Sequence, residues 1–254
     1  MTVNPGAVWR VGYRPQPWAW TPWQYAGDTG RFDGRWDDPA GSFRTLYAGR
    51  NLLACLLEVL ARFRPDPLLG EDLAGIVEDP DDAQVYPTQP PGTVPTSWLT
   101  PRQASTATLS GIFCAVTDKE SLPTLRNAFL STALRYGLAD LDAGALRLSA
   151  PRTLTQRIAA WLYDLHDGAS DLIDGVQFES RHGDALTLWA IFEQGPDPDV
   201  SLQLSGTRAV PLPRGPGETG ETGGDQCFRR RGRCARVPED AAPAARVGGG
   251  GGAH

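Results

Sequence analysis

The sequence is poor in the side chains that bind metals. It has only three histidines and four cysteines in 254 residues, and their spacing matches neither a zinc site nor a disulfide framework. Cys55 and Cys114 lie inside apolar runs, where a free thiol behaves as a small buried hydrophobic group. We therefore expect no structural metal.

Long apolar segments are also missing. No stretch approaches the ~20 apolar residues that span a bilayer, and the first residues lack a basic segment followed by an apolar run. We therefore expect a soluble, cytoplasmic protein with no membrane partner.

Positive charge is scarce in most of the chain. The net charge is −6, although seven arginines against five acidic residues make the segment from Arg214 onward positive. The remaining body is therefore acidic, whereas binding to a phosphate backbone needs clustered Lys and Arg. We do not expect the body to bind nucleic acid. The CFRRRGRC stretch at 227–234 is either part of a solvated tail or a patch for nucleic acid or a partner.

Composition divides the chain into a body and a tail. With 41% hydrophobic and 21% charged residues, the chain can form one substantial core. Beyond about residue 215 the sequence consists mainly of Gly, Glu, Thr, Arg and Ala, which bury too little apolar surface to offset the entropy of ordering. We predict one domain over residues 1–212 and a disordered tail over residues 213–254.

Apolar periodicity predicts an α+β fold. Strand patterns occur at 7–14, 44–49, 174–180 and 186–193, the last two joined by a turn at 181–184, with a further strand at 200–206. Helical spacing occurs at 51–63, 121–137 and 152–166, and short extended segments are expected at 74–78 and 97–99. Because helices and strands do not alternate regularly, we predict a central mixed or antiparallel sheet with flanking helices.

The segment at residues 15–41 is an unusually aromatic loop. Its rings are Trp18, Trp20, Trp23, Tyr25, Phe32 and Trp36. Such rings either pack under a long loop or stack on a planar ligand, and the sequence leaves both interpretations open.

Three further segments carry polar side chains in a distinctive order. They are GRFDGRWDDPAG at 30–41, LYAGRNLLACLLEVL at 46–60 and DGVQFESRHG at 174–183. This order of a GRW turn, a Tyr ending a strand, a Glu within a helix and an SR pair resembles the RES domain, named for its Arg, Glu and Ser. The resemblance covers most of residues 8–195. It implies an ADP-ribosyltransferase-like fold and an enzyme that degrades NAD by phosphorolysis or hydrolysis, acting as the toxin of a type II toxin–antitoxin pair.

The resemblance also implies which residues form the site. By position, Arg35, Tyr47, Glu58 and Ser180 match the family's active-site residues, and Arg10 matches a further arginine placed against the ligand, together with Arg35 and Tyr47. NAD is then the substrate, inorganic phosphate a co-substrate of phosphorolysis, and no other cofactor is implied. The expected protein partner is a helical antitoxin that covers the pocket, and a homo-oligomer stays open.

The chemistry of Glu58 can be argued from its surroundings. It lies within an apolar helix, where a carboxylate is costly unless it is paired or hydrogen-bonded, and Arg35 is a plausible partner. Cleavage of an N-glycosidic bond develops positive charge on the ribose, which a fixed carboxylate stabilises. The alternative is a solvent-facing Glu paired with Arg62, four positions on.

The other site residues also have two interpretations each. The planar fork of Arg35 can hold a pyrophosphate or phosphate, or it can form a surface pair with Asp37 or Asp38. Tyr47 can stack on nicotinamide, or it can be a core tyrosine with a satisfied hydroxyl. Ser180 can position the substrate or the attacking phosphate, or it can be an ordinary serine in a turn after a strand.

Two departures from the family pattern bear on these roles. Asp37 stands where the family usually has Asn, which puts an extra negative charge near the proposed anion site, and Phe178 replaces a Tyr. Two alternatives therefore stay beside NAD degradation: transfer of ADP-ribose to a protein, and a non-catalytic protein that binds a partner through the aromatic loop.

Overall fold

The computed structural model describes residues 1–68, 71, 75, 92–148, 150–168, 170–195, 201 and 203–210. The first 213 residues form one compact unit. Its fold is α+β, with a curled eight-stranded mixed sheet and several helices, which confirms the predicted fold class. The predicted tail at 213–254 and most of the extended segment predicted at 74–78 lie outside the described residues.

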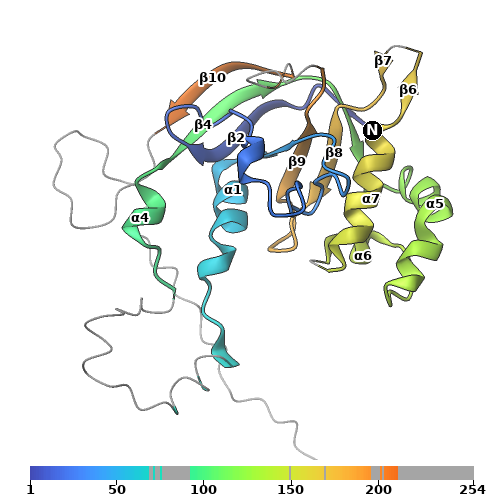
Figure 1. Cartoon of the computed structure of the whole chain (residues 1–254), viewed down its shortest axis with the longest axis horizontal. Helices are drawn as coiled ribbons and strands as arrows, with labels where there is room; N and C mark the ends of the chain where they lie inside the picture. The colour runs from blue at the N-terminus through green and yellow to red at the C-terminus, as the bar shows by residue number, and fades with distance from the viewer. Residues whose placement is uncertain are drawn as a thin grey trace, which may run out of the picture. The chain divides into compact units, whose positions relative to one another are not determined.

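The sheet has the order β1-β5-β8-β9-β3-β2-β4-β10 (Figure 1). Strands β5 and β8 are parallel, and every other neighbouring pair is antiparallel. The strands are β1 (Thr2–Val3), β2 (Gly6–Tyr13), β3 (Thr45–Gly49), β4 (Arg102–Leu109), β5 (Ile112–Ala115), β8 (Gly175–Glu179), β9 (Thr187–Phe192) and β10 (Leu204–Val210). A separate two-stranded sheet pairs β6 (His166–Asp167) with β7 (Ser170–Asp171).

The described helices flank this sheet. They are α1 (Leu52–Val59), α4 (Thr96–Leu99), α5 (Leu122–Arg135), α6 (Ala143–Arg147) and α7 (Arg152–Tyr163), with short 3-10 turns η1 (Trp23–Tyr25) and η2 (Ala61–Phe63). Helix α1 packs against β2, β3 and β9, whereas α7 packs against α5 and β8 (Figure 1). Within the described part of the chain, none of the helices combines the length and the apolar character needed to cross a bilayer.

Local signals place α1 between β3 and a chain reversal. Asn51 caps the helix by accepting a hydrogen bond from the amide of Ala54, at 2.8 Å. The α-helix ends at Val59, earlier than the predicted helix of residues 51–63, and continues into the 3-10 turn η2. This leaves Glu58 in the last turn of α1, next to the start of the loop that follows.

Three sequence expectations differ from the structure. Residues 97–99 belong to the helix α4 rather than to an extended segment, because Pro95 precedes a helical turn in which Trp98 packs edge-on against Phe63. The strand expected at 200–206 begins only at Leu204. Strand β4 was not predicted, because its sequence RQASTATL contains little apolar surface.

The aromatic loop packs on the domain. Trp18, Trp20 and Trp36 are all buried, and the indole nitrogen of Trp18 donates to Ser105 Oγ at 2.8 Å. Tyr25 alone among the loop's Trp and Tyr rings is strongly exposed, at 67%. The packing interpretation of the loop is therefore confirmed for these three tryptophans. Cys55 and Cys114 are buried free thiols, as predicted.

Strand β8 lies unusually close to its neighbours at Gly175. A Cβ at this position would lie 2.1 Å from the carbonyl oxygen of Ala190 and 3.0 Å from the ring of Phe113. Only glycine fits such a close approach without moving backbone atoms. The close packing of β8 against β9 therefore requires a residue without a side chain at position 175.

The sheet opens between β2 and β3. The two strands share a single residue pair, Trp9 with Gly49, whereas β3 pairs with β9 along its whole length. Beyond that pair the two strands are connected through the guanidinium of Arg10 instead of by backbone pairing. Its Nη1 donates to the carbonyl of Tyr47 and its Nε to the carbonyl of Pro17, both at 2.7 Å. Buried carbonyls need such partners, so Arg10 replaces part of the missing ladder.

A buried ion pair closes the other end of β3. Arg44 donates from Nε to Glu193 Oε2 at 2.8 Å and from Nη2 to Oε1, and its backbone amide also donates to Oε2. Both side chains are less than a tenth exposed. The pair joins the start of β3 to the end of β9.

We predict that Arg44→Met lowers the free energy of unfolding by about 3–5 kcal/mol, because it leaves the Glu193 carboxylate buried without its charged partner. Urea unfolding followed by circular dichroism measures this. Arg126→Met is the matched control: its ion pair with Asp140 is about half exposed, so the loss should stay below about 1 kcal/mol. Equal losses in the two variants would contradict the assignment.

Candidate functional site

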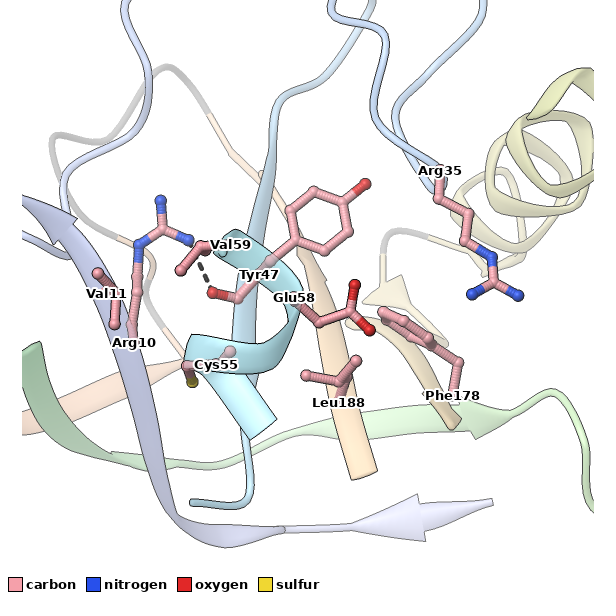
Figure 2. A pocket seen from close by; sticks show the side chains of 10 residues that line it. Arg10, Val11, Arg35, Tyr47, Cys55, Glu58, Val59, Phe178 and Leu188 are labelled. Carbon is pink, nitrogen blue, oxygen red and sulfur yellow. Dashed lines mark hydrogen bonds between the residues drawn. The ribbon is translucent and has the colours of Figure 1, made fainter. Parts of the chain in front are cut away.

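A pocket of about 380 Å³ lies where β2 and β3 part, beside α1 (Figure 2). This volume lies within the usual range for small-molecule sites. Its lining comes from β2, the GRW turn, β3, α1, β8 and β9: Arg10, Val11, Arg35, Tyr47, Ala48, Cys55, Glu58, Val59, Phe178 and Leu188. Among the described residues, no group of three or more His, Cys, Asp or Glu side chains is arranged to hold a metal ion.

The structure brings the sequence-predicted residues together. Arg10, Arg35, Tyr47 and Glu58 all line this pocket. Ser180 is not part of the pocket lining, but it contacts the Glu58 carboxylate and is only 2% exposed. Figure 2 shows the Glu58 carboxylate leaving α1 toward Phe178, with Arg35 beyond it.

The hydrogen-bonding partner of Glu58 is Ser180. The hydroxyl of Ser180 donates to Glu58 Oε1 at 2.5 Å. The expected pairing with Arg35 is wrong, because the ion pairs among the described residues include none between these two. Glu58 acts on Arg35 only over a longer distance, where its charge opposes the lowering of the arginine pKa by burial. The alternative of a solvent-facing pair with Arg62 is not formed either.

Ser180 points at the carboxylate rather than at the open pocket. Its hydroxyl hydrogen is used by Glu58, and its oxygen accepts a hydrogen bond from the backbone amide of His182 at 3.0 Å. The first interaction links the end of β8 to α1, and the second is local to the turn that follows β8. The arrangement fixes one carboxylate oxygen of Glu58 in place.

His182 is a site residue that sequence reasoning missed. Its Nε2 lies 4.0 Å from Glu58 Oε2, and its Nδ1 lies 3.0 Å from Nη1 of Arg64. Burial, Arg64 and Arg181 lower the pKa of His182, while the charge of Glu58 opposes them. A histidine in a turn after a strand carries no distinguishing signal in a single sequence. His182 lies near Glu58 only because the fold places the turn after β8 beside α1.

Tyr47 ties the GRW turn to β3. Its hydroxyl accepts from the amide of Trp36 and donates to Asp37 Oδ1, both at 2.9 Å. The other Asp37 oxygen accepts from the amide of Gly34 at 2.5 Å. Burial raises the pKa of Tyr47 well above its ordinary value, and the nearby Asp37 charge adds to this. The hydroxyl of Tyr47 is therefore satisfied within the protein, and its ring lines the pocket.

Asp37 is part of the loop rather than of an anion site. It is 7% exposed, and burial raises its pKa, although bonds to Tyr47, Gly34 and Thr45 oppose the rise. The alternative of a surface pair between Arg35 and Asp37 or Asp38 is not among the ion pairs of the described residues: the two carboxylates accept hydrogen bonds from the loop backbone and, at Asp37, from Tyr47. The departure from Asn at this position therefore places its charge against Tyr47 and the loop backbone.

Arg35 has unused hydrogen-bonding capacity. Its guanidinium lies over the rings of Trp36 and Phe178, at 5.6 and 5.4 Å from their centroids. Its Nε and Nη2 are buried without a hydrogen-bond partner among the described residues. Burial lowers the pKa of Arg35 to about 10, against the opposing charges of Glu58 and Tyr47. Buried donors without partners are costly, so an anion in the pocket would satisfy them.

Arg10 is held more firmly than Arg35. Two of its five N–H groups bond to the carbonyls of Pro17 and Tyr47, and the rest of the guanidinium borders the pocket (Figure 2). Burial lowers its pKa to about 10. Arg10 thus adds a second positive charge to the pocket while it bridges β2 to the carbonyl of Tyr47 in β3.

Comparison with known proteins gives one family. The family model of the RES domain matches residues 7–214, a span that contains Arg10, Arg35, Tyr47, Glu58 and Ser180. No curated protein matches the sequence.

We predict that Tyr47→Phe lowers the free energy of unfolding by about 1–3 kcal/mol, because the buried Trp36 amide and Asp37 carboxylate lose a partner. Chemical denaturation measures the change. Tyr25→Phe, whose ring is mostly exposed, is the control and should leave the unfolding midpoint unchanged. A stable Tyr47→Phe protein would show that the hydroxyl does not hold the turn.

Proposed function

The chain belongs to the RES domain family, and we propose that its pocket binds NAD and cleaves the bond between nicotinamide and ribose. The observation that supports the proposal is that one pocket contains both a fixed negative charge and a positive charge with buried hydrogen-bond donors. A carboxylate, Glu58, is fixed by Ser180, while the guanidinium of Arg35 has buried donors that find no partner among the described residues. A substrate with a cationic glycosidic centre and anionic phosphates complements both.

Glu58 would stabilise the reacting sugar. When the glycosidic bond breaks, nicotinamide leaves as a neutral molecule with the bonding electrons, and positive charge develops on the ribose. A carboxylate already held in position stabilises that charge without reorganising during the reaction. An oxygen of water or of phosphate then forms the new bond to the ribose carbon, and water or a protonated phosphate gives up its proton to solvent.

Arg35 and Arg10 would bind the anionic part of the substrate. The planar fork of Arg35 can make two parallel hydrogen bonds to a pyrophosphate or to an incoming phosphate, which a lysine cannot copy. Arg10 supplies a second positive charge from β2. The rings of Tyr47 and Phe178 border the same space and offer apolar surface to a flat nicotinamide.

The cellular role that we propose is that of a toxin in a toxin–antitoxin pair. Loss of NAD would stop growth, and a helical antitoxin covering the pocket would prevent it. Transfer of ADP-ribose to a protein is the competing outcome, and it would leave label from an NAD analogue on protein.

The test is incubation of the purified protein with NAD, with and without inorganic phosphate, followed by product analysis. We expect falling NAD and release of nicotinamide. ADP-ribose identifies water as the acceptor, and ADP-ribose 1-phosphate, formed only when phosphate is added, identifies phosphorolysis. NAD that stays intact under both conditions would overturn the proposal.

Glu58→Gln should slow this cleavage by on the order of a hundredfold or more, because it removes the charge and keeps the size. The glutamine can still accept the bond from Ser180, so the fold should be retained. Glu120→Gln, which changes an exposed residue, should cleave at the wild-type rate. Unchanged turnover in Glu58→Gln would remove Glu58 from the mechanism.

A further inference from the structure

A line of polar contacts runs from the loop after α1 back to the pocket. Arg64 contacts His182 Nδ1 at 3.0 Å, and His182 Nε2 faces Glu58 Oε2 at 4.0 Å. Ser180 holds the other carboxylate oxygen at 2.5 Å. Each oxygen of Glu58 therefore has its own neighbour, and both neighbours belong to the turn after β8.

We propose that His182 is a positioning residue, fixed by Arg64 as a neutral imidazole with its proton on Nε2, which orients the Glu58 carboxylate for the reaction proposed above. The proposal rests on that proposed function. It adds a residue outside the pocket lining and a means by which pH can control the site.

The contact with Arg64 determines which ring nitrogen carries the proton. A guanidinium only donates hydrogen bonds, so Nδ1 of His182 must accept from Arg64. A neutral imidazole then carries its hydrogen on Nε2, the nitrogen that faces Glu58. The spacing of 4.0 Å is too long for a direct hydrogen bond, so the ring acts on Glu58 through the dipole of its N–H group.

His182 also acts through its backbone. Its amide donates to Ser180 Oγ at 3.0 Å, and this orients the hydroxyl whose hydrogen reaches Glu58. One residue thus affects both carboxylate oxygens by separate routes. A side-chain substitution removes only the route through the ring, which makes the two routes separable.

Burial, together with two neighbouring arginines, favours the neutral form of His182. The imidazole side chain is 9% exposed, and it faces Arg64 from the loop after η2, Arg181 from its own turn and Glu58 from α1. Burial and the two arginines lower the pKa of His182, and Glu58 raises it. Protonation would turn Nδ1 into a donor facing Arg64 and would pair the imidazolium with Glu58. The carboxylate would then be neutralised by its neighbour instead of by the substrate, so cleavage should fall as His182 gains its proton.

Two variants of His182 separate positioning from general packing. Glutamine places an amide N–H near the position of Nε2, whereas asparagine reaches only as far as Nδ1. We expect His182→Asn to lower kcat by about tenfold, as expected for a displaced reacting group, and to change KM for NAD by less than about twofold. His182→Gln should restore most of kcat and lose the acid limb that His182 gives the wild-type pH profile.

Arg64 and Glu58 provide an independent readout without turnover. The chain has only three histidines, so their imidazole nitrogens can be followed by NMR and His182 assigned from His182→Gln. We expect the Nε2–H tautomer and a pKa below the ordinary histidine value. Arg64→Met should raise this pKa by removing a positive charge, and Glu58→Gln should lower it further by removing a negative one.

The outcomes distinguish the two proposals. Wild-type protein that leaves NAD intact overturns the proposed function, whatever the titrations show. An Nδ1–H tautomer, or a His182 pKa that neither substitution moves, overturns the positioning role even if NAD is cleaved. Equal kcat in His182→Asn, His182→Gln and wild type, at equal unfolding free energy, also overturns it.

Discussion

The site depends on the way the sheet opens between β2 and β3. Two neighbouring strands that part must leave backbone groups without their ladder partners, and buried carbonyls do not tolerate this. The side chain of Arg10 supplies hydrogen-bond donors here: its guanidinium donates to the carbonyl of Tyr47 and to that of Pro17. The gap can then persist as a pocket in the middle of the sheet, with α1 beside it. A positive charge is built into that pocket by the same contact that keeps it open.

Two separate hydrogen-bond systems fix the other walls. On one side, Tyr47 and Asp37 hold the turn that carries Arg35. On the other, the Ser180 hydroxyl donates to Glu58, and the backbone amide of His182 donates to that hydroxyl. No ion pair links the two systems among the described residues, so the carboxylate and the guanidinium stay apart across the pocket. Had they neutralised each other, neither would be available to a ligand.

The sequence predicted the helices and strands whose apolar patterns are strong, including α5, α7, β8 and β9. Strand β4 was not predicted, because its serines and threonines show no strand pattern in the sequence. They form a strand by pairing with β2 on one side and β10 on the other. The residues of the site were predicted from the order of three segments, but their partners were not. Arg35 was considered as the partner of Glu58, and Asp37 was expected to put negative charge near the proposed anion site. Which polar group becomes the hydrogen-bond partner of a site residue depends on the directions of the side chains after folding. For the same reason the sequence did not indicate that His182 lies near Glu58.

Gly175 shows how a residue without a side chain can affect the position of residues in the site. It allows β8 to lie against β9 with almost no clearance from the carbonyl of Ala190. Ser180 follows five residues later, just past the end of the same strand, and reaches Glu58 at 2.5 Å. A methyl group at Gly175 would displace β8 and carry the serine with it. The position of the Glu58 carboxylate therefore depends on the close approach of β8 to β9 at Gly175, a residue that does not line the pocket.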